Sequence, residues 1–122
     1  MATYNEPYRE FGALLSEGAG SISREVITVK SGAGVLSAGT VLGKVTTGGK
    51  YEGYDDGKSN GAETAVAVLM DNVDASSADV SAAVIVRLAE VKKDGLVWIA
   101  AVDATAKTKA YSDLAAAYVI AR

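Results

Sequence analysis

The sequence predicts a single β-rich α+β domain with one short helix near the C-terminus. Three observations carry this prediction. Its 122 residues suffice for one domain with a modest core. Short runs of alternating apolar and polar residues are separated by turn signals rich in glycine and aspartate, which is typical of strands. One segment close to the end shows helical spacing instead.

The first 22 residues differ from the remainder and are interpreted as an N-terminal arm, followed by a β domain over 23–122. The stretch "MATYNEPYREFGALLSEGAGSIS" shows no sustained period of 2 or 3.6. Two interpretations remain open: a disordered leader, or a segment that orders against a partner, which so many large apolar side chains favour. The candidate anchors of the second interpretation are Tyr4, Pro7, Tyr8, Phe11, Leu14, Leu15 and Ile22.

Strands are expected in the first half of the domain at "SREVITVK", residues 23–30, and on both sides of "TTGG". Residues 31–39, "SGAGVLSAG", are expected to be turns. The runs "TVLGKV" and "KYEGY" predict a hairpin, because the glycines between them supply the positive φ of a tight turn.

The second half predicts two further strands, at 62–73 and at 80–92, separated by the turn "DASSAD". An apolar run, "LVWIAAV", follows a turn at 93–95. Asp103 or Thr105 then caps a helix that places Ala106, Ala110, Leu114 and Ala117 on one face. With a last strand at "YVIAR", the total is six or seven strands.

Composition lowers the expectation of catalysis. The chain has no cysteine, which removes disulfides and thiolate chemistry, and no histidine, the usual acid or base near neutral pH. Its net charge of −3 provides no basic surface for nucleic acid. No apolar run approaches the roughly 20 residues that span a bilayer, and the start does not resemble a signal peptide. We therefore expect a non-enzymatic protein without cofactor, nucleic acid or membrane partner, made in a cytoplasm.

Several apparent chemical motifs have simpler interpretations. The glycines of "GAGVLSAG" lack dinucleotide-binding spacing and precede a strand. Asp71, Asp74 and Asp79 do not follow the calcium-loop series, and Glu63 with Asp71 shows no sign of a shared pocket. An acidic turn explains the aspartates.

Lys50 is the one residue that suggests another function. Lipoyl and biotinyl carrier domains are small β sandwiches that display a lysine at a hairpin tip, so a carrier or adaptor domain using Lys50 is the alternative. However, "GGKYE" lacks the flanking acid or methionine residues of those carriers. A carbohydrate or cell-surface binding module is a third, weaker alternative, because aromatic residues are sparse.

Five apolar residues outside the arm are candidates for core or subunit contacts. Leu96 and Trp98 lie in an apolar run that contains the only tryptophan. The complete set is Val41, Leu42, Val45, Leu96 and Trp98.

An ordered set of segments covers nearly the whole chain and resembles the lambda-type bacteriophage head decoration proteins. These segments are "REFGALLSEGAGSISREVITV", "AGTVLGKVTTGGKYEGYD", "AETAVAVLMDNVDAS", "AAVIVRLAEV", "GLVW" and "DLAAAYVIAR". Their order, rather than any one of them, carries the resemblance. One departure lies near the end, where many relatives have a glycine and this chain has Ala117 and Tyr118.

The resemblance implies a β-tulip fold and a structural role in the virion. It implies homotrimers on the outer capsid surface at threefold and quasi-threefold positions, where they cement capsomers of the expanded head against the pressure of packaged DNA. The partner would be the major capsid protein, and synthesis would take place in the bacterial host cytoplasm. The arm, from Tyr4 to Ile22, would order on the shell.

Overall fold

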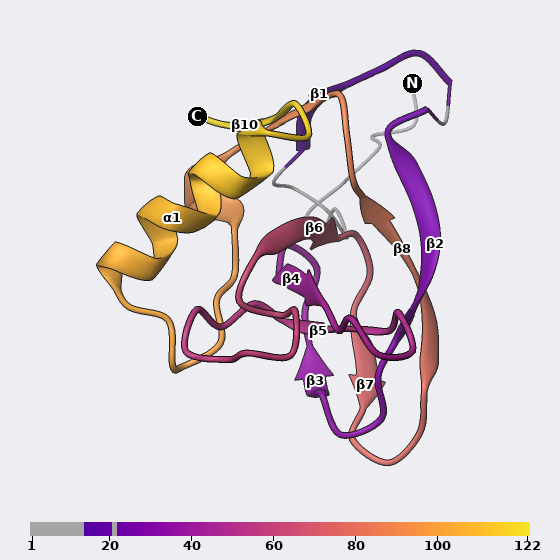
Figure 1. Ribbon diagram of the computed structural model, residues 1–122. Helices are drawn as coiled ribbons and strands as arrows, with labels where there is room; N and C mark the ends of the chain where they lie inside the picture. Colours follow the sequence, from indigo (N-terminus) through magenta and orange to yellow (C-terminus); the bar gives the residue numbers. More distant parts are fainter. Residues whose placement is uncertain (1–13, 21) are drawn as a thin grey trace.

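The computed structural model describes residues 14–20 and 22–122. In this part the chain forms ten strands, a 3₁₀ turn and one α-helix (Figure 1). In chain order they are β1 (Leu14–Glu17), β2 (Arg24–Val29), β3 (Gly34–Leu36), β4 (Val41–Lys44), β5 (Tyr51–Gly53), β6 (Ala65–Leu69), β7 (Val73–Ala75), β8 (Val80–Ile85), β9 (Ala89–Val91), the 3₁₀ turn η1 (Lys93–Gly95), α1 (Ala104–Ala115) and β10 (Val119–Ala121).

A closed barrel with strand order β2-β5-β4-β6-β8 forms the body of the domain. β2 and β8 pair antiparallel along their full length, and a single parallel pair, Val29 with Tyr51, closes the barrel between β2 and β5. Ile27 and Val29 of β2 are buried while Val26 is exposed, as the alternation of a half-buried strand requires. The predicted fold class is therefore confirmed, and the barrel is consistent with the term β-tulip.

A second sheet, ordered β1-β9-β10, lies beside the barrel together with the helix. β9 pairs antiparallel with β1 and parallel with β10. α1 packs against β6 and β10 and buries Ala106, Ala110 and Leu114. The Asp103 carboxylate accepts a hydrogen bond from the Ala106 amide at 2.8 Å, so Asp103 is the helix cap.

The small sheet β3-β7 lies at the end of the molecule opposite β1 and β10 (Figure 1). β3 corrects the expectation that residues 31–39 are only turns, because Gly34–Leu36 pair with β7 over three residues. The predicted hairpin is confirmed: β4 pairs antiparallel with β5, and Gly48 and Gly49 have φ of 90° and 69°.

Two predicted strands are wrong in length, because each is interrupted. The segment 80–92 ends one strand at Ile85 and begins the next at Ala89, since Leu88 takes a left-handed backbone conformation with φ of 51°. In the segment 62–73 the strand β6 ends at Leu69, and β7 begins at the last residue, Val73, and extends into the predicted turn at 74–79. The strands β1, β3, β7 and β9 raise the count above the expected six or seven.

The expected helical face is correct for its first three members and wrong for Ala117. α1 ends at Ala115, where the Ala117 and Tyr118 amides bond to the carbonyls of Leu114 and Ala115 in a tightened last turn. Tyr118 then leaves the helix with φ of 62°. The run "LVWIAAV" pairs only through a bridge between Thr40 and Val97 and forms no strand.

Candidate functional site

The described residues contain no arrangement suited to metal chemistry. Within 14–20 and 22–122, no three acidic side chains gather where they could hold a metal ion. Asp74 accepts hydrogen bonds from the amide and hydroxyl of Ser76, two residues on, whereas Asp79 bonds to the Ser31 amide. Asp74 thus stabilises its own turn, whereas Asp79 joins its turn to the loop after β2. No helix in the described part of the chain is long and apolar enough to cross a membrane.

Lys50 lies just after the turn of the β4-β5 hairpin, immediately before β5. Its Nζ bonds to Asp79 Oδ2 at 2.6 Å, and this hydrogen bond together with that of the Ser31 amide lowers the pKa of Asp79. The amine is thus held against a neighbouring loop, whereas a carrier lysine projects freely from a hairpin tip. This geometry gives the carrier interpretation no support.

Four of the five apolar contact candidates lie inside the domain. Val41, Leu42, Val45 and Leu96 are buried within the single chain. Trp98 is half-buried, with edge-to-face contacts to Tyr54 and Tyr111 at centroid separations of 6.3 and 5.8 Å. Their role in contacts between subunits remains a prediction.

The structure divides the candidate arm residues into two groups. Tyr4, Pro7, Tyr8 and Phe11 lie outside the described residues. Leu14 is half-buried in β1 against the core, whereas Leu15 and Ile22 are exposed. Within the predicted arm, residues Leu14–Glu17 therefore form a strand paired to β9.

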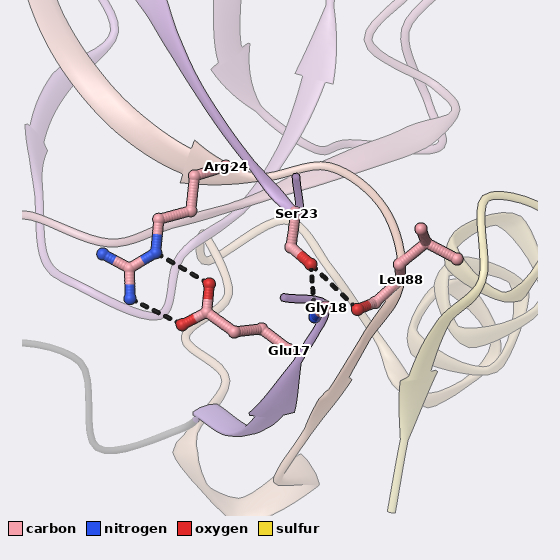
Figure 2. A network of polar contacts seen from close by, with 5 residues as sticks. All are labelled: Glu17, Gly18, Ser23, Arg24 and Leu88. Carbon is pink, nitrogen blue, oxygen red and sulfur yellow. Dashed lines mark hydrogen bonds and ion pairs between the residues drawn. The ribbon is translucent and has the colours of Figure 1, made fainter. Parts of the chain in front are cut away.

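The end of β1 is held to the domain by a small polar network (Figure 2). The buried Ser23 hydroxyl donates to the Leu88 carbonyl at 2.9 Å and accepts from the Gly18 amide at 2.8 Å. Beside it, Arg24 holds Glu17 through two hydrogen bonds of 2.8 and 2.6 Å. The network joins the end of β1, the start of β2 and the loop before β9.

A larger residue at position 18 would crowd this network and displace the exposed Ile22 side chain. A Cβ built there would lie 2.5 Å from Ile22 Cγ2 and 3.2 Å from the Ser23 hydroxyl.

The hydrogen bond with Arg24, supported by its charge, holds the pKa of Glu17 below its usual value, so the pair stays ionised near neutral pH.

Two exposed apolar residues that the sequence did not single out as a pair lie next to this network. Leu88 and Tyr118 both have positive φ, and the Ala89 amide bonds to the Tyr118 carbonyl at 3.0 Å. They line a shallow surface depression with Ser16, Glu17, Gly18, Ala89, Glu90 and Ile120. Tyr118 was noticeable in the sequence as a departure from glycine, but no signal connected it with Leu88.

Comparison with known proteins identifies the family. The family described as bacteriophage lambda head decoration protein D matches residues 3–119. No curated protein matches the sequence. The family match covers both the region preceding β1 and the whole barrel, in agreement with the resemblance carried by the ordered segments. The chain belongs to the family of the bacteriophage lambda head decoration protein D, structural proteins that associate with the phage capsid as part of the virion.

Proposed function

We propose that the protein forms homotrimers that bind the outer surface of the expanded phage head at threefold and quasi-threefold positions. Bound there, the trimers cement neighbouring capsomers against the internal pressure of packaged DNA. The observation that carries this proposal is the family match over residues 3–119, nearly the full chain. The major capsid protein is the proposed partner.

The composition of the core supports the trimeric state. Valine and alanine dominate the buried set, and the largest fully buried side chains are few. A domain of this size buries roughly two-thirds of the surface of its unfolded chain. Additional burial between subunits would stabilise it by mass action.

We further propose that residues 1–22 tether each subunit to the shell. The family match begins at residue 3, so it includes this region. The base of the segment is fixed by β1 and the Ser23 network, which gives a tether a firm point of attachment. Three arms on one trimer would bind with an effective concentration that a single arm lacks.

Co-sedimentation with phage heads tests the function. The purified protein is mixed with expanded, undecorated heads and, separately, with unexpanded heads, while its solution mass is measured by light scattering. We expect a trimer that pellets with expanded heads and not with unexpanded ones. Failure to pellet with expanded heads of its own phage contradicts the proposed function.

A truncation tests the tether. Removing residues 1–13 keeps β1, whereas a cut at residue 21 would also remove the strand paired with β9. The shorter deletion should leave solution mass and thermal unfolding unchanged and abolish binding to heads. If the truncated protein still pellets at wild-type levels, the arm is not the main tether.

A further inference from the structure

Neither the fold nor the proposed function accounts for a polar cavity beside the β4-β5 hairpin. The cavity has a volume of about 510 Å³ and is open to solvent. Its lining comes from the hairpin, the loop after β2, the loop after β5 and the residue just before β8. The polar side chains of this lining are Lys30, Ser31, Thr47, Lys50, Asn60 and Asp79. Cavities of this volume hold ligands of small-molecule size.

Hydrogen bonds within the chain hold the walls of the cavity in place. Asp79 joins two walls, because its Oδ1 accepts from the Ser31 amide at 2.8 Å and its Oδ2 from Lys50 Nζ at 2.6 Å. A third wall is held by the Thr46 amide, which donates to the Asn60 carbonyl at 2.8 Å. A ligand therefore meets polar groups that are already arranged, which lowers the entropic cost of binding.

The charges of the lining favour an anion. Lys30 and Lys50 contribute two positive charges and Asp79 one negative charge, so the lining carries a net charge of +1. Glu52, on the neighbouring strand β5, is paired with Lys58 at 3.0 Å and leaves this balance unchanged. The whole chain, in contrast, has a net charge of −3. Ammonium groups bind carboxylate and phosphate oxygens through charge-assisted hydrogen bonds.

The remainder of the lining suits hydroxyl groups. The Asn60 amide and the hydroxyls of Ser31 and Thr47 each offer both donors and acceptors, and the Asp79 carboxylate offers acceptors. Val45, which is buried, adds an apolar wall. A sugar ring presents hydroxyl groups at its edge and C–H groups on its faces, so it matches this mixture better than an apolar ligand does.

We propose that this cavity binds an anionic sugar, a monosaccharide unit that carries a carboxylate or a phosphate group. Lys30 binds the anionic group, while Asn60 and Thr47 bind hydroxyl groups of the ring. Lys50 has a structural role in this site, because its bond to Asp79 holds two walls together. The proposal goes beyond binding to phage heads and does not depend on it, so either can fail without the other.

An NMR titration of the full-length, ¹⁵N-labelled protein tests the proposal. The probes are glucuronate and glucose 6-phosphate, and the comparison ligands are glucose, acetate and inorganic phosphate. We expect saturable shifts of the Ser31, Thr47 and Lys50 amides with at least one anionic sugar. Glucose should bind about tenfold more weakly or worse, because it lacks the charged partner for Lys30. The anionic sugar that binds identifies the carboxylate or the phosphate as the preferred group, and binding of both shows that either is accepted.

A matched pair of lysine substitutions tests the role of Lys30. Lys30→Ala should bind the anionic sugar about tenfold more weakly and unfold at the wild-type temperature, because Lys30 is exposed. Lys92→Ala removes the same charge from an exposed lysine outside the cavity and should leave the affinity unchanged. Equal loss of affinity in both variants would overturn the proposal, because overall charge rather than the cavity would then attract the sugar.

Three results of the titration would also overturn the proposal. The first is the lack of a saturable shift with either anionic sugar. The second is an affinity for acetate or inorganic phosphate equal to that for the corresponding sugar, because the cavity would then bind a bare anion without contacting the ring. The third is a set of shifts centred on amides away from the cavity, which would place the binding site elsewhere.

Discussion

The Ser23 hydroxyl donates a hydrogen bond to the carbonyl oxygen of Leu88 across 65 positions of sequence, at 2.9 Å. The same hydroxyl accepts from the Gly18 amide, which also donates to that carbonyl. One buried side chain thereby holds both the left-handed turn before β9 and the end of β1. A local turn conformation thus depends on a contact from a distant strand.

Ser23→Ala should lower the free energy of unfolding by about 1–2 kcal/mol, because it leaves the buried polar groups around Leu88 with one partner fewer. Denaturant titration at a fixed protein concentration measures the change. Ser16→Ala is the matched control, since Ser16 bonds Glu90 at the exposed surface and its loss should cost under about 0.5 kcal/mol. Equal effects of the two substitutions would show that burial of Ser23 has no energetic consequence.

Gly43 and Gly34 show two different reasons why a position needs glycine: lack of space for a side chain at Gly43, and a positive φ at Gly34. At Gly43 a Cβ would lie 2.5 to 2.8 Å from backbone atoms of Ala62, whereas at Gly34 the space is open and only its φ of 90° is unfavourable. Gly43→Ala should therefore cost about 1–3 kcal/mol or more, as an overpacked core does, and Gly34→Ala about 1 kcal/mol. Thermal unfolding of both variants checks the order, and a larger loss for Gly34→Ala would contradict the steric explanation.

Local patterns predicted the elements whose determinants are local. The cap of Asp103, the alternation of β2 and the glycine turn of the β4-β5 hairpin all depend on residues within a few positions of each other. The break between β8 and β9 could not be predicted this way, because Leu88 is apolar and its turn is held by Ser23 and Gly18 from another part of the chain.

The candidate arm is a prediction from its aromatic and apolar residues, which the sequence shows directly. The pairing of Leu88 with Tyr118 arises only when β10 lies parallel beside β9, and neither residue carries a signal of that neighbour. Core burial of Val41 and Leu42 was one of the two roles that the sequence predicted, whereas the closed barrel that buries them was not predicted by the local pattern.

Because of Glu52, the free energy of unfolding should fall as pH decreases through the acid range. Burial acts to raise the pKa of this carboxyl, but hydrogen bonds from Asn60 at 2.8 Å and Lys58 at 3.0 Å together outweigh burial and hold the pKa below its ordinary 4.5. A lowered folded pKa means that the ionised group stabilises the fold above the unfolded pKa, and that this contribution is lost as pH falls through the folded pKa.

Glu52→Gln isolates that contribution, because it keeps the shape and removes the charge. The variant should be less stable than wild-type near neutral pH, and the difference should shrink progressively below pH 4.5. Unfolding titrations across the acid range measure it. Glu25→Gln is the control, since Glu25 pairs with Arg87 at the exposed surface and the cost should be small at every pH. A Glu52→Gln difference that does not vary with pH would contradict the assignment.

Because of Tyr54, the free energy of unfolding should fall as pH rises into the alkaline range. Its hydroxyl is buried between the barrel and α1 and donates to the Ala106 carbonyl at 2.8 Å. Burial, reinforced by nearby aspartates, raises the pKa of Tyr54 to about 12. A raised folded pKa favours the neutral phenol, so its stabilisation is complete below the unfolded value of 10 and is lost as pH rises toward about 12.

Tyr54→Phe should lower the free energy of unfolding by about 1 kcal/mol at neutral pH, because it removes the hydrogen bond. It should also reduce the loss of stability at alkaline pH. Unfolding titrations from neutral to alkaline pH, with Tyr118→Phe as the exposed control, check both effects. If the Tyr54→Phe protein loses stability above pH 10 as steeply as wild-type, then Tyr54 is not the group whose ionisation loosens the helix from the barrel.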